Sequence, residues 1–206
     1  MADMVSLSLW LSNYNESAML EFWKRVIEAF PASASSPGIG ALTIYPLNWG
    51  ESPVLERSFG EGLDASEVVE FAAEFLHEDY AYEVQMNWDL WFPKGAPSSG
   101  NWIQTPTALS IACLGPEFDR EGSDNRSDLQ VNFGLDTPFL PFEEDSMPPY
   151  HPAWEIADLR TRENLQKLIG FVHRLDGTLP VKKRLLSCES GENLAEKILE
   201  IWNLRI

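Results

Sequence analysis

Few residues in this chain combine a reactive side chain with the spacing that a reaction needs. The three histidines, His77, His151 and His173, are scattered and form no H-x-x-x-H or H-E-x-x-H pair, the usual signature of a helical zinc site. His77, Glu78 and Asp79 are adjacent, but neighbouring side chains at a helix end point in different directions. We therefore expect no metal site.

Nucleophile and phosphate-binding motifs are also missing. No G-x-S-x-G turn occurs, and Ser190 before Gly191 fits a helix N-cap better than a nucleophile elbow. The glycines of PGIGA at 37–41 precede an expected strand, whereas phosphate-binding loops lead into a helix. We therefore expect no catalytic residues and no cofactor, and the sequence favours a protein that is not an enzyme.

The segment YAYEVQMNWDLWF at 80–92 holds the richest set of candidate contact residues. Its even positions are apolar and its odd positions are mostly polar, the period of a half-buried strand. This alternation places Trp88 in the core and leaves Asp89 and Trp91 on the other face, and Trp102 follows a loop rich in Gly, Pro and Ser. Aromatic faces beside carboxylates suit a sugar platform, so Asp89, Trp91 and Trp102 are candidate ligand contacts.

The net charge of the chain limits the kinds of molecule that we expect it to bind. Thirty-two acidic residues against fifteen basic ones give −17, and residues 1–93 hold 15 acids and 3 bases while residues 160–206 hold 6 acids and 9 bases. A field of this sign repels phosphate backbones and anionic lipid headgroups, and it speeds encounter with basic proteins. We expect no nucleic acid and no membrane as partner. That the acidity serves only solubility stays open.

The cysteines and the start of the chain indicate the compartment. Cys113 and Cys188 are too few for a disulfide framework, and Cys113 lies in an apolar run that predicts a buried free thiol. The first residues have no basic segment before their apolar stretch, and no run reaches the ~18 apolar residues of a membrane span. We expect a cytoplasmic protein.

The N-terminal part predicts the element order β-α-β-β-α-β. The expected strands span 5–12, 40–47, 53–60 and 80–92. Asn13 with Glu16, and Asp64 with Glu67, have the spacing of capping boxes and predict two helix starts. This order also occurs in ferredoxin-like folds, so such a fold is one alternative.

The C-terminal part predicts an extension of the same sheet. Further strands are expected at 107–114, 129–136 and 179–187, and helices are expected after Thr161 and Ser190. The whole chain, 1–206, therefore predicts a single α+β domain with a two-layer, largely antiparallel sheet of six to seven strands. Four helices lie mainly on one face. A subdivision into 1–93 and 94–206 stays open.

The acidity, the small size and the lack of motifs together resemble the profile of immunity-type proteins, which neutralise basic toxins, often nucleases. This resemblance implies a non-catalytic protein that binds a basic protein partner. Trp and Tyr are enriched at interface hot spots, and carboxylates would meet the basic surface. The candidate contact residues are Trp91, Trp102, Glu143, Glu144, Asp145, Tyr150 and Trp154.

An alternative function is a small-molecule or carbohydrate-binding protein, or a hydrolase. Its pocket would lie near Asp89, Trp91, Trp102 and the proline-rich loop 137–159, because long loops commonly cover functional sites. A closed pocket with convergent polar groups would favour this alternative. A flat acidic surface with exposed tryptophans would favour protein binding. The sequence does not indicate an oligomeric state.

Overall fold

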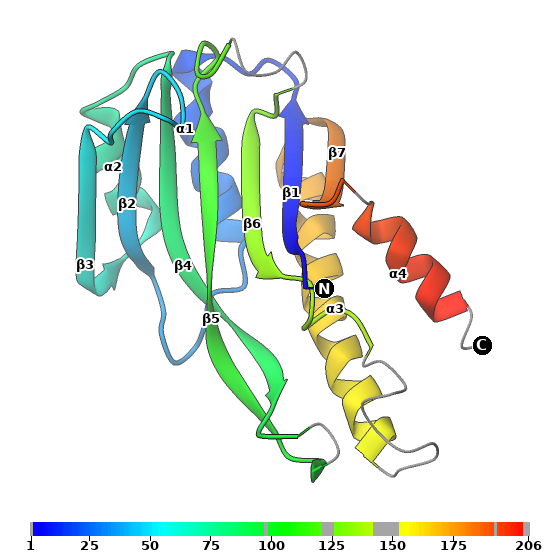
Figure 1. The fold of residues 1–206 in the computed structure, drawn as a ribbon. Helices are drawn as coiled ribbons and strands as arrows, with labels where there is room; N and C mark the ends of the chain where they lie inside the picture. The colour runs from blue at the N-terminus through cyan, green and yellow to red at the C-terminus, as the bar shows by residue number, and fades with distance from the viewer. Residues whose placement is uncertain (1, 97–98, 121–125, 142–152, 192, 204–206) are drawn as a thin grey trace.

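The segments with strand periodicity pair into one antiparallel sheet. The computed structural model describes residues 2–96, 99–120, 126–141, 153–191 and 193–203, and within them seven strands pair in the order β3-β2-β4-β5-β6-β1-β7 (Figure 1). Neighbouring strands are antiparallel throughout. The strands are β1 (Met4–Leu11), β2 (Ile39–Pro46), β3 (Leu55–Leu63), β4 (Tyr80–Pro93), β5 (Trp102–Leu114), β6 (Leu129–Leu135) and β7 (Val181–Cys188).

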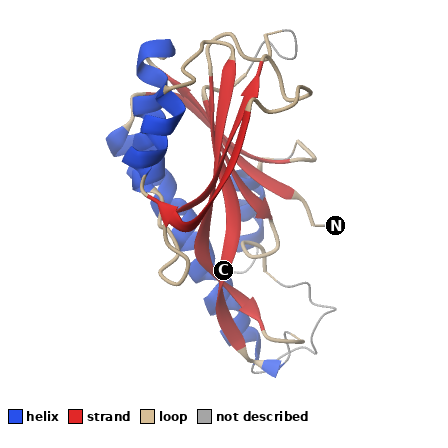
Figure 2. Cartoon of the chain, turned by 90° about the vertical axis from the view of Figure 1, so that its left-hand side faces the viewer, coloured by secondary structure: helices blue, strands red, loops and turns tan. Residues whose placement is uncertain are grey.

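Helices cover one face of this sheet, as expected. The described residues form α1 (Glu16–Ala29), α2 (Ala65–Ala73), α3 (Ala153–Thr178) and α4 (Leu194–Asn203). Helices α1, α2 and α3 lie on one face, and α4 lies beside the β7 edge (Figures 1 and 2). The core fills the space between the two layers, and Trp88 is fully buried in it, which confirms its predicted position. The two-layer α+β class is therefore confirmed. Among the described residues, no helix has the length and hydropathy that a bilayer crossing requires.

The other face of the sheet carries a row of small polar side chains beside a small apolar cluster of Ala81, Ala112, Leu114 and Phe118. The register brings Gln85, Ser110, Asn132 and Ser6 into one row across β4, β5, β6 and β1. Glu83 lies in the neighbouring row, where burial raises the pKa of its carboxyl and a hydrogen bond from Ser110 partly opposes this rise. Glu56 of β3 lies in the same row as Glu83, and the carboxyl of Glu83 is the one whose pKa burial raises.

The N-terminal order β-α-β-β-α-β is confirmed, but the strands of this segment are not all neighbours. Strand β1 pairs with β6 on one side and with β7 on the other, so that Val5 lies opposite Cys188. Strands β5 and β6 separate β1 from β4. Residues near the two ends of the chain therefore share one half of the sheet.

One of the two predicted capping boxes is present. The Asp64 side chain accepts from the Glu67 N–H at 2.9 Å and the Glu67 side chain accepts from the Asp64 N–H at 2.9 Å, at the start of α2. The prediction for the first helix is wrong in its position. Asn15, not Asn13, is the N-cap and accepts from the Ala18 N–H at 3.1 Å. Asn13 has a φ of +61° and forms the turn that leads into α1.

Strands β4 and β5 extend beyond the rest of the sheet and meet the first half of α3 (Figure 1). We call this part the arm; it comprises residues 88–93, 102–107 and 153–167. Helix α3 begins at Ala153, well before the Thr161 cap that the sequence predicts, so that prediction is wrong. Ala153 and Ala157 are buried against Trp102 and Trp154. This packing stabilises a helical turn that follows a proline-rich segment.

Candidate functional site

The three tryptophans predicted as contacts all lie in the arm. Trp91 and Trp102 line one cavity of about 240 Å³. The other described residues that line it are Phe92, Pro93, Thr137, Pro138 and Thr161. Trp102 and Trp154 both pack against Ala153 and Ala157. The structure therefore brings Trp91 and Trp102 together, while Trp154 supports the wall behind them.

One face of the Trp91 ring is already covered by the chain itself. The Arg160 guanidinium lies 3.8 Å from the centroid of the indole, a cation–π contact. Arg160 also pairs with Glu163 at 2.7 Å. A ligand that stacks on Trp91 can therefore use only the side of the ring that faces the cavity.

Asn164 of α3 fixes the backbone of Trp91. This asparagine is fully buried. Its Oδ1 accepts from the Trp91 N–H at 2.8 Å, and its Nδ2 donates to the carbonyls of Trp91 at 3.0 Å and Pro138 at 3.1 Å. One side chain thus provides hydrogen-bond partners for the backbone edge of β4 beyond the last residue that pairs with β2. The sequence carries only a weak signal for this role, because helical spacing does not distinguish a buried asparagine beside Leu165 from an exposed one.

Asp89 anchors a loop instead of facing the cavity. Its carboxylate accepts from Ser33 Oγ at 2.6 Å and from the Ala34 N–H at 2.9 Å. The hydrogen bond from Ser33 is the main cause that lowers the pKa of Asp89. The carboxylate therefore holds the loop between α1 and β2 against β4, and it does not line the cavity of Trp91 and Trp102.

Cys113 shows no sign of a reactive thiol. Cys113 is fully buried, and burial raises the pKa of its thiol to about 12. Its Sγ lies 3.2 Å from the Tyr14 hydroxyl, which donates to the Leu114 carbonyl at 2.7 Å. Because the thiolate is the reactive form, Cys113 has the properties of an inert core residue. The predicted buried free thiol is confirmed.

The described histidines do not lie in a cluster of ligands large enough to hold a metal ion. No group of three His, Cys, Asp or Glu residues within those ranges could hold a metal ion. His77 pairs with Asp79, and His173 is exposed on α3. His151 lies outside the described residues.

Three loops meet at the end of the sheet opposite the arm. They precede β3, β4 and β6, and backbone hydrogen bonds join them. The Leu47 N–H donates to the Asp79 carbonyl at 2.8 Å, and the Asp119 N–H donates to the Leu47 carbonyl at 2.7 Å. The Glu117 N–H donates to the Glu78 carbonyl at 2.7 Å. These bonds make the loops a fixed surface.

Leu47 and Trp49 project from this surface. Leu47 is 53% exposed and has a φ of +59°, a left-handed conformation that leucine rarely adopts. Trp49 is 41% exposed. Its ring packs edge-on against Tyr45 and Phe118, with centroids 5.1 Å apart in both pairs. Phe118 is fully buried beneath it. The inner edge of the indole is therefore packed against the protein, and its outer edge is exposed to solvent.

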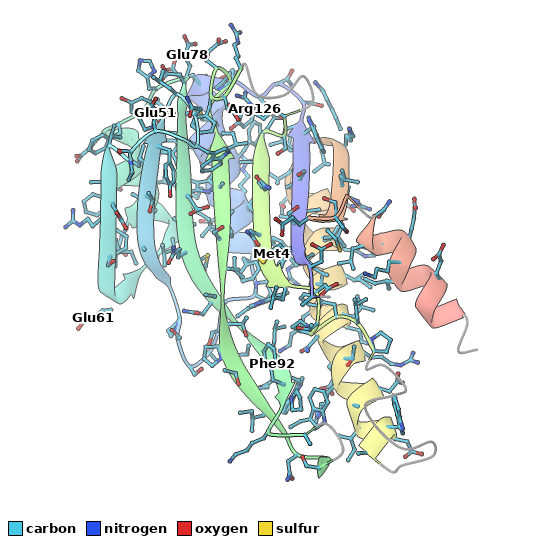
Figure 3. All side chains as sticks on the ribbon, viewed as in Figure 1. Met4, Glu51, Glu61, Glu78, Phe92 and Arg126 are labelled. Carbon is cyan, nitrogen blue, oxygen red and sulfur yellow. The ribbon has the colours of Figure 1, made fainter. Side chains whose placement is uncertain are left out.

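Carboxylates surround these two apolar side chains. Glu51 and Glu78 are exposed and project from the same end of the molecule (Figure 3). Glu117 pairs with Arg120, and Asp119 interacts electrostatically with Arg126, whereas Glu51 and Glu78 form no ion pair with a described residue. We call the surface formed by Leu47, Trp49, Glu51, Glu78 and Asp119 the sheet-end patch. It combines exposed apolar groups with an excess of negative charge.

The sheet-end patch was not among the predicted contacts. Glu143, Glu144, Asp145 and Tyr150, which were predicted, lie outside the described residues. The available signal was the turn LNWGESP at 47–53, which places large apolar residues among turn formers. Taken by its residue types alone, this segment indicates only a connection between two strands.

Comparison of the chain with protein-family models finds no match. The comparisons with curated proteins and with solved structures also find none.

Proposed function

We propose that this protein binds a basic protein partner and that the sheet-end patch is the contact surface. In its most specific form, the partner is a cationic toxin or nuclease and the protein is its immunity-type inhibitor. The proposal rests on one observation above all, the exposed Leu47 in a left-handed conformation.

The conformation of Leu47 is costly for the isolated chain. A left-handed backbone costs a residue such as leucine about 1–2 kcal/mol, and an exposed side chain recovers little of this by burial. Backbone hydrogen bonds to Asp79 and from Asp119 hold the residue in place. Strained residues cluster at binding sites. A partner that buries Leu47 and Trp49 would supply the apolar contact that the chain does not.

The carboxylates around the sheet-end patch favour a basic partner. Glu51, Glu78 and Asp119 ring the apolar centre, which matches the usual plan of an apolar hot spot within a polar rim. Their charge would accelerate the encounter with a cationic surface and make its rate depend on salt. The negative charge of the sheet-end patch supports the basic partner that the composition led us to expect. The proposed contact surface, however, lies in a different part of the chain from the predicted contact residues.

The test is a pull-down with tagged protein from the cells that make it, at low and at high salt. Captured basic proteins are then purified and their dissociation constants measured. We expect Trp49→Ala to weaken binding by more than about tenfold, as hot-spot truncations do. Leu47→Asn should weaken it also, although asparagine suits the left-handed backbone.

A matched control is Leu159→Asn, because Leu159 is 51% exposed on α3, away from the sheet-end patch. This control should bind as the unmodified protein does. If Trp49→Ala and Leu159→Asn bind equally well, the sheet-end patch is not the interface. If no basic protein is captured at either salt concentration, the proposed function is wrong.

The second candidate function is the binding of a small ligand in the arm. The observation in its favour is that Trp91 and Trp102 line the same cavity of about 240 Å³. That volume lies below the ~300–1,000 Å³ of drug-sized sites, so it suits a ligand the size of a single sugar ring. Titration with monosaccharides should change tryptophan fluorescence, and Trp102→Ala should abolish the change. An identical response in Trp102→Ala would remove this alternative.

A further inference from the structure

A second cavity lies at the β7 edge of the sheet, between α3, α4 and β7. Its volume is about 360 Å³, within the ~300–1,000 Å³ of small-molecule sites. Leu7 and Leu186 pair across β1 and β7 and form its floor. Leu168 and Ile169 of α3 form one wall, and Ile198 of α4 forms the other. We call this cavity the α3–α4 cleft.

The lining of the α3–α4 cleft indicates what it can hold. The apolar side chains among its described lining residues are aliphatic, with no aromatic ring. Among the described lining residues, the aromatic surface is limited to the imidazole of His173, in contrast to the tryptophans that line the cavity in the arm. Leu7 and Leu168 are fully buried, whereas Ile169 is 44% exposed. An alkyl chain in the cleft would contact the core and cover the exposed isoleucine.

The mouth of the cleft carries a guanidinium with unused donors. Arg184 lines the cleft, and its Nη1 donates to both carboxylate oxygens of Asp176. Arginine has five N–H donors, and no described residue accepts from its Nε or Nη2. Residues 160–206 hold 9 bases and 6 acids, so the surrounding chain is the least acidic part of the molecule. A carboxylate is a group that a guanidinium recognises through charge-assisted hydrogen bonds.

We propose that the α3–α4 cleft binds a medium-chain carboxylate. The alkyl chain lies against Leu7, Leu168 and Ile198, and the carboxylate accepts from Arg184. The volume is near the lower limit for ligand sites, which favours a short chain over a long one. The site is independent of the proposed function, because the cleft lies at the β7 edge and shares no residue with the sheet-end patch, which the loops before β3, β4 and β6 form.

The test uses two probes that share a ten-carbon chain and differ in the charge of the head group. Decanoate and decyltrimethylammonium are titrated below their micelle-forming concentrations, and methyl NMR spectra and calorimetry are recorded. We expect decanoate to shift the methyl signals of Ile169, Leu186 and Ile198. Decyltrimethylammonium should bind at least about tenfold more weakly, because it offers the guanidinium no acceptor.

Two variants separate the tail from the head group. Ala195→Phe places a ring in the cleft from an exposed position of α4, and it should abolish the methyl shifts. Arg184→Gln should weaken decanoate by about tenfold, the loss of one charge-assisted interaction. Lys183→Gln is the matched control, because Lys183 contacts Trp10 on the other face of the sheet. It should change the dissociation constant by less than about twofold.

Several results would overturn the proposal. Decanoate binding that survives Ala195→Phe would place the alkyl chain elsewhere. Equal losses in Arg184→Gln and Lys183→Gln would reduce the effect to general charge. Equal binding of both probes would exclude a carboxylate site, and no binding of decanoate would exclude the ligand class. If the circular dichroism of Ala195→Phe shows misfolding, Ile169→Trp fills the cleft from its exposed wall instead.

Discussion

Replacing Asn164 with leucine should strongly destabilise the arm. The substitution removes the partners of the Trp91 N–H, the Trp91 carbonyl and the Pro138 carbonyl, all bonded at 2.8 to 3.1 Å. Each buried polar group left without a partner costs about 1–3 kcal/mol. Water entering beside the arm and the added apolar surface offset part of this cost. We therefore expect Asn164→Leu to lower the free energy of unfolding by about 3–5 kcal/mol.

Urea denaturation at pH 7, followed by circular dichroism, measures this loss. The control is Asn101→Ala, an exposed position at the tip of the same strand pair, which should change stability by less than about 0.5 kcal/mol. Asn164→Asp sharpens the test. Its carboxylate would face two carbonyl oxygens at neutral pH, and protonation at acidic pH would restore one donor. A loss below about 1 kcal/mol in Asn164→Leu would refute the view that this side chain replaces a missing strand.

Three further substitutions test the pKa shift, the loop packing and the strained loop. Glu83→Gln should raise stability at pH 7, because burial raises the folded pKa of Glu83. The folded state then binds the proton more tightly, so the stability of the unmodified protein falls as the pH rises from the ordinary pKa of 4.5 through the raised one. In urea titrations the gain should vanish well below pH 4.5. Gly115→Ala should cost about 3 kcal/mol or prevent folding, as thermal denaturation will show, because its Cβ would lie 2.4 Å from the Glu78 carbonyl oxygen. Leu47→Asn should raise the melting temperature through a gain of about 1 kcal/mol from the relaxed left-handed backbone.

Local periodicity in the sequence predicts which face of a strand is buried. Trp88 is in the core because it shares its face with Val84 and Met86, and that relation needs only a period of two residues. The capping box of Asp64 and Glu67 is equally local. Both predictions depend on residues a few positions apart, which is why they could be made correctly.

The candidate sites depend on contacts between segments that are distant in the sequence. The periodicity of a single segment cannot predict such contacts. The register of β4 and β5 places Trp91 and Trp102 on one face of that strand pair, but the cavity also needs Thr161 of α3, and Asn164 holds α3 beside β4. Asp89 has the residue type of a ligand contact, but its carboxylate accepts a hydrogen bond from Ser33 of the loop before β2. The exposure of Leu47 depends on hydrogen bonds to two other loops. No spacing rule in the sequence predicts these partners.

The place of β1 between β6 and β7 has a consequence for how the chain is made. A ribosome synthesises β1 before its two partner strands, which follow only at Leu129–Leu135 and Val181–Cys188. Until these strands are synthesised, the backbone edges of β1 lack their partners. Unpaired edges can pair with the wrong strand. Contacts so distant in sequence also slow the folding of the finished chain. We expect nascent chains that stop before β7 to depend on chaperones, whereas chains in which β7 has paired with β1 should not.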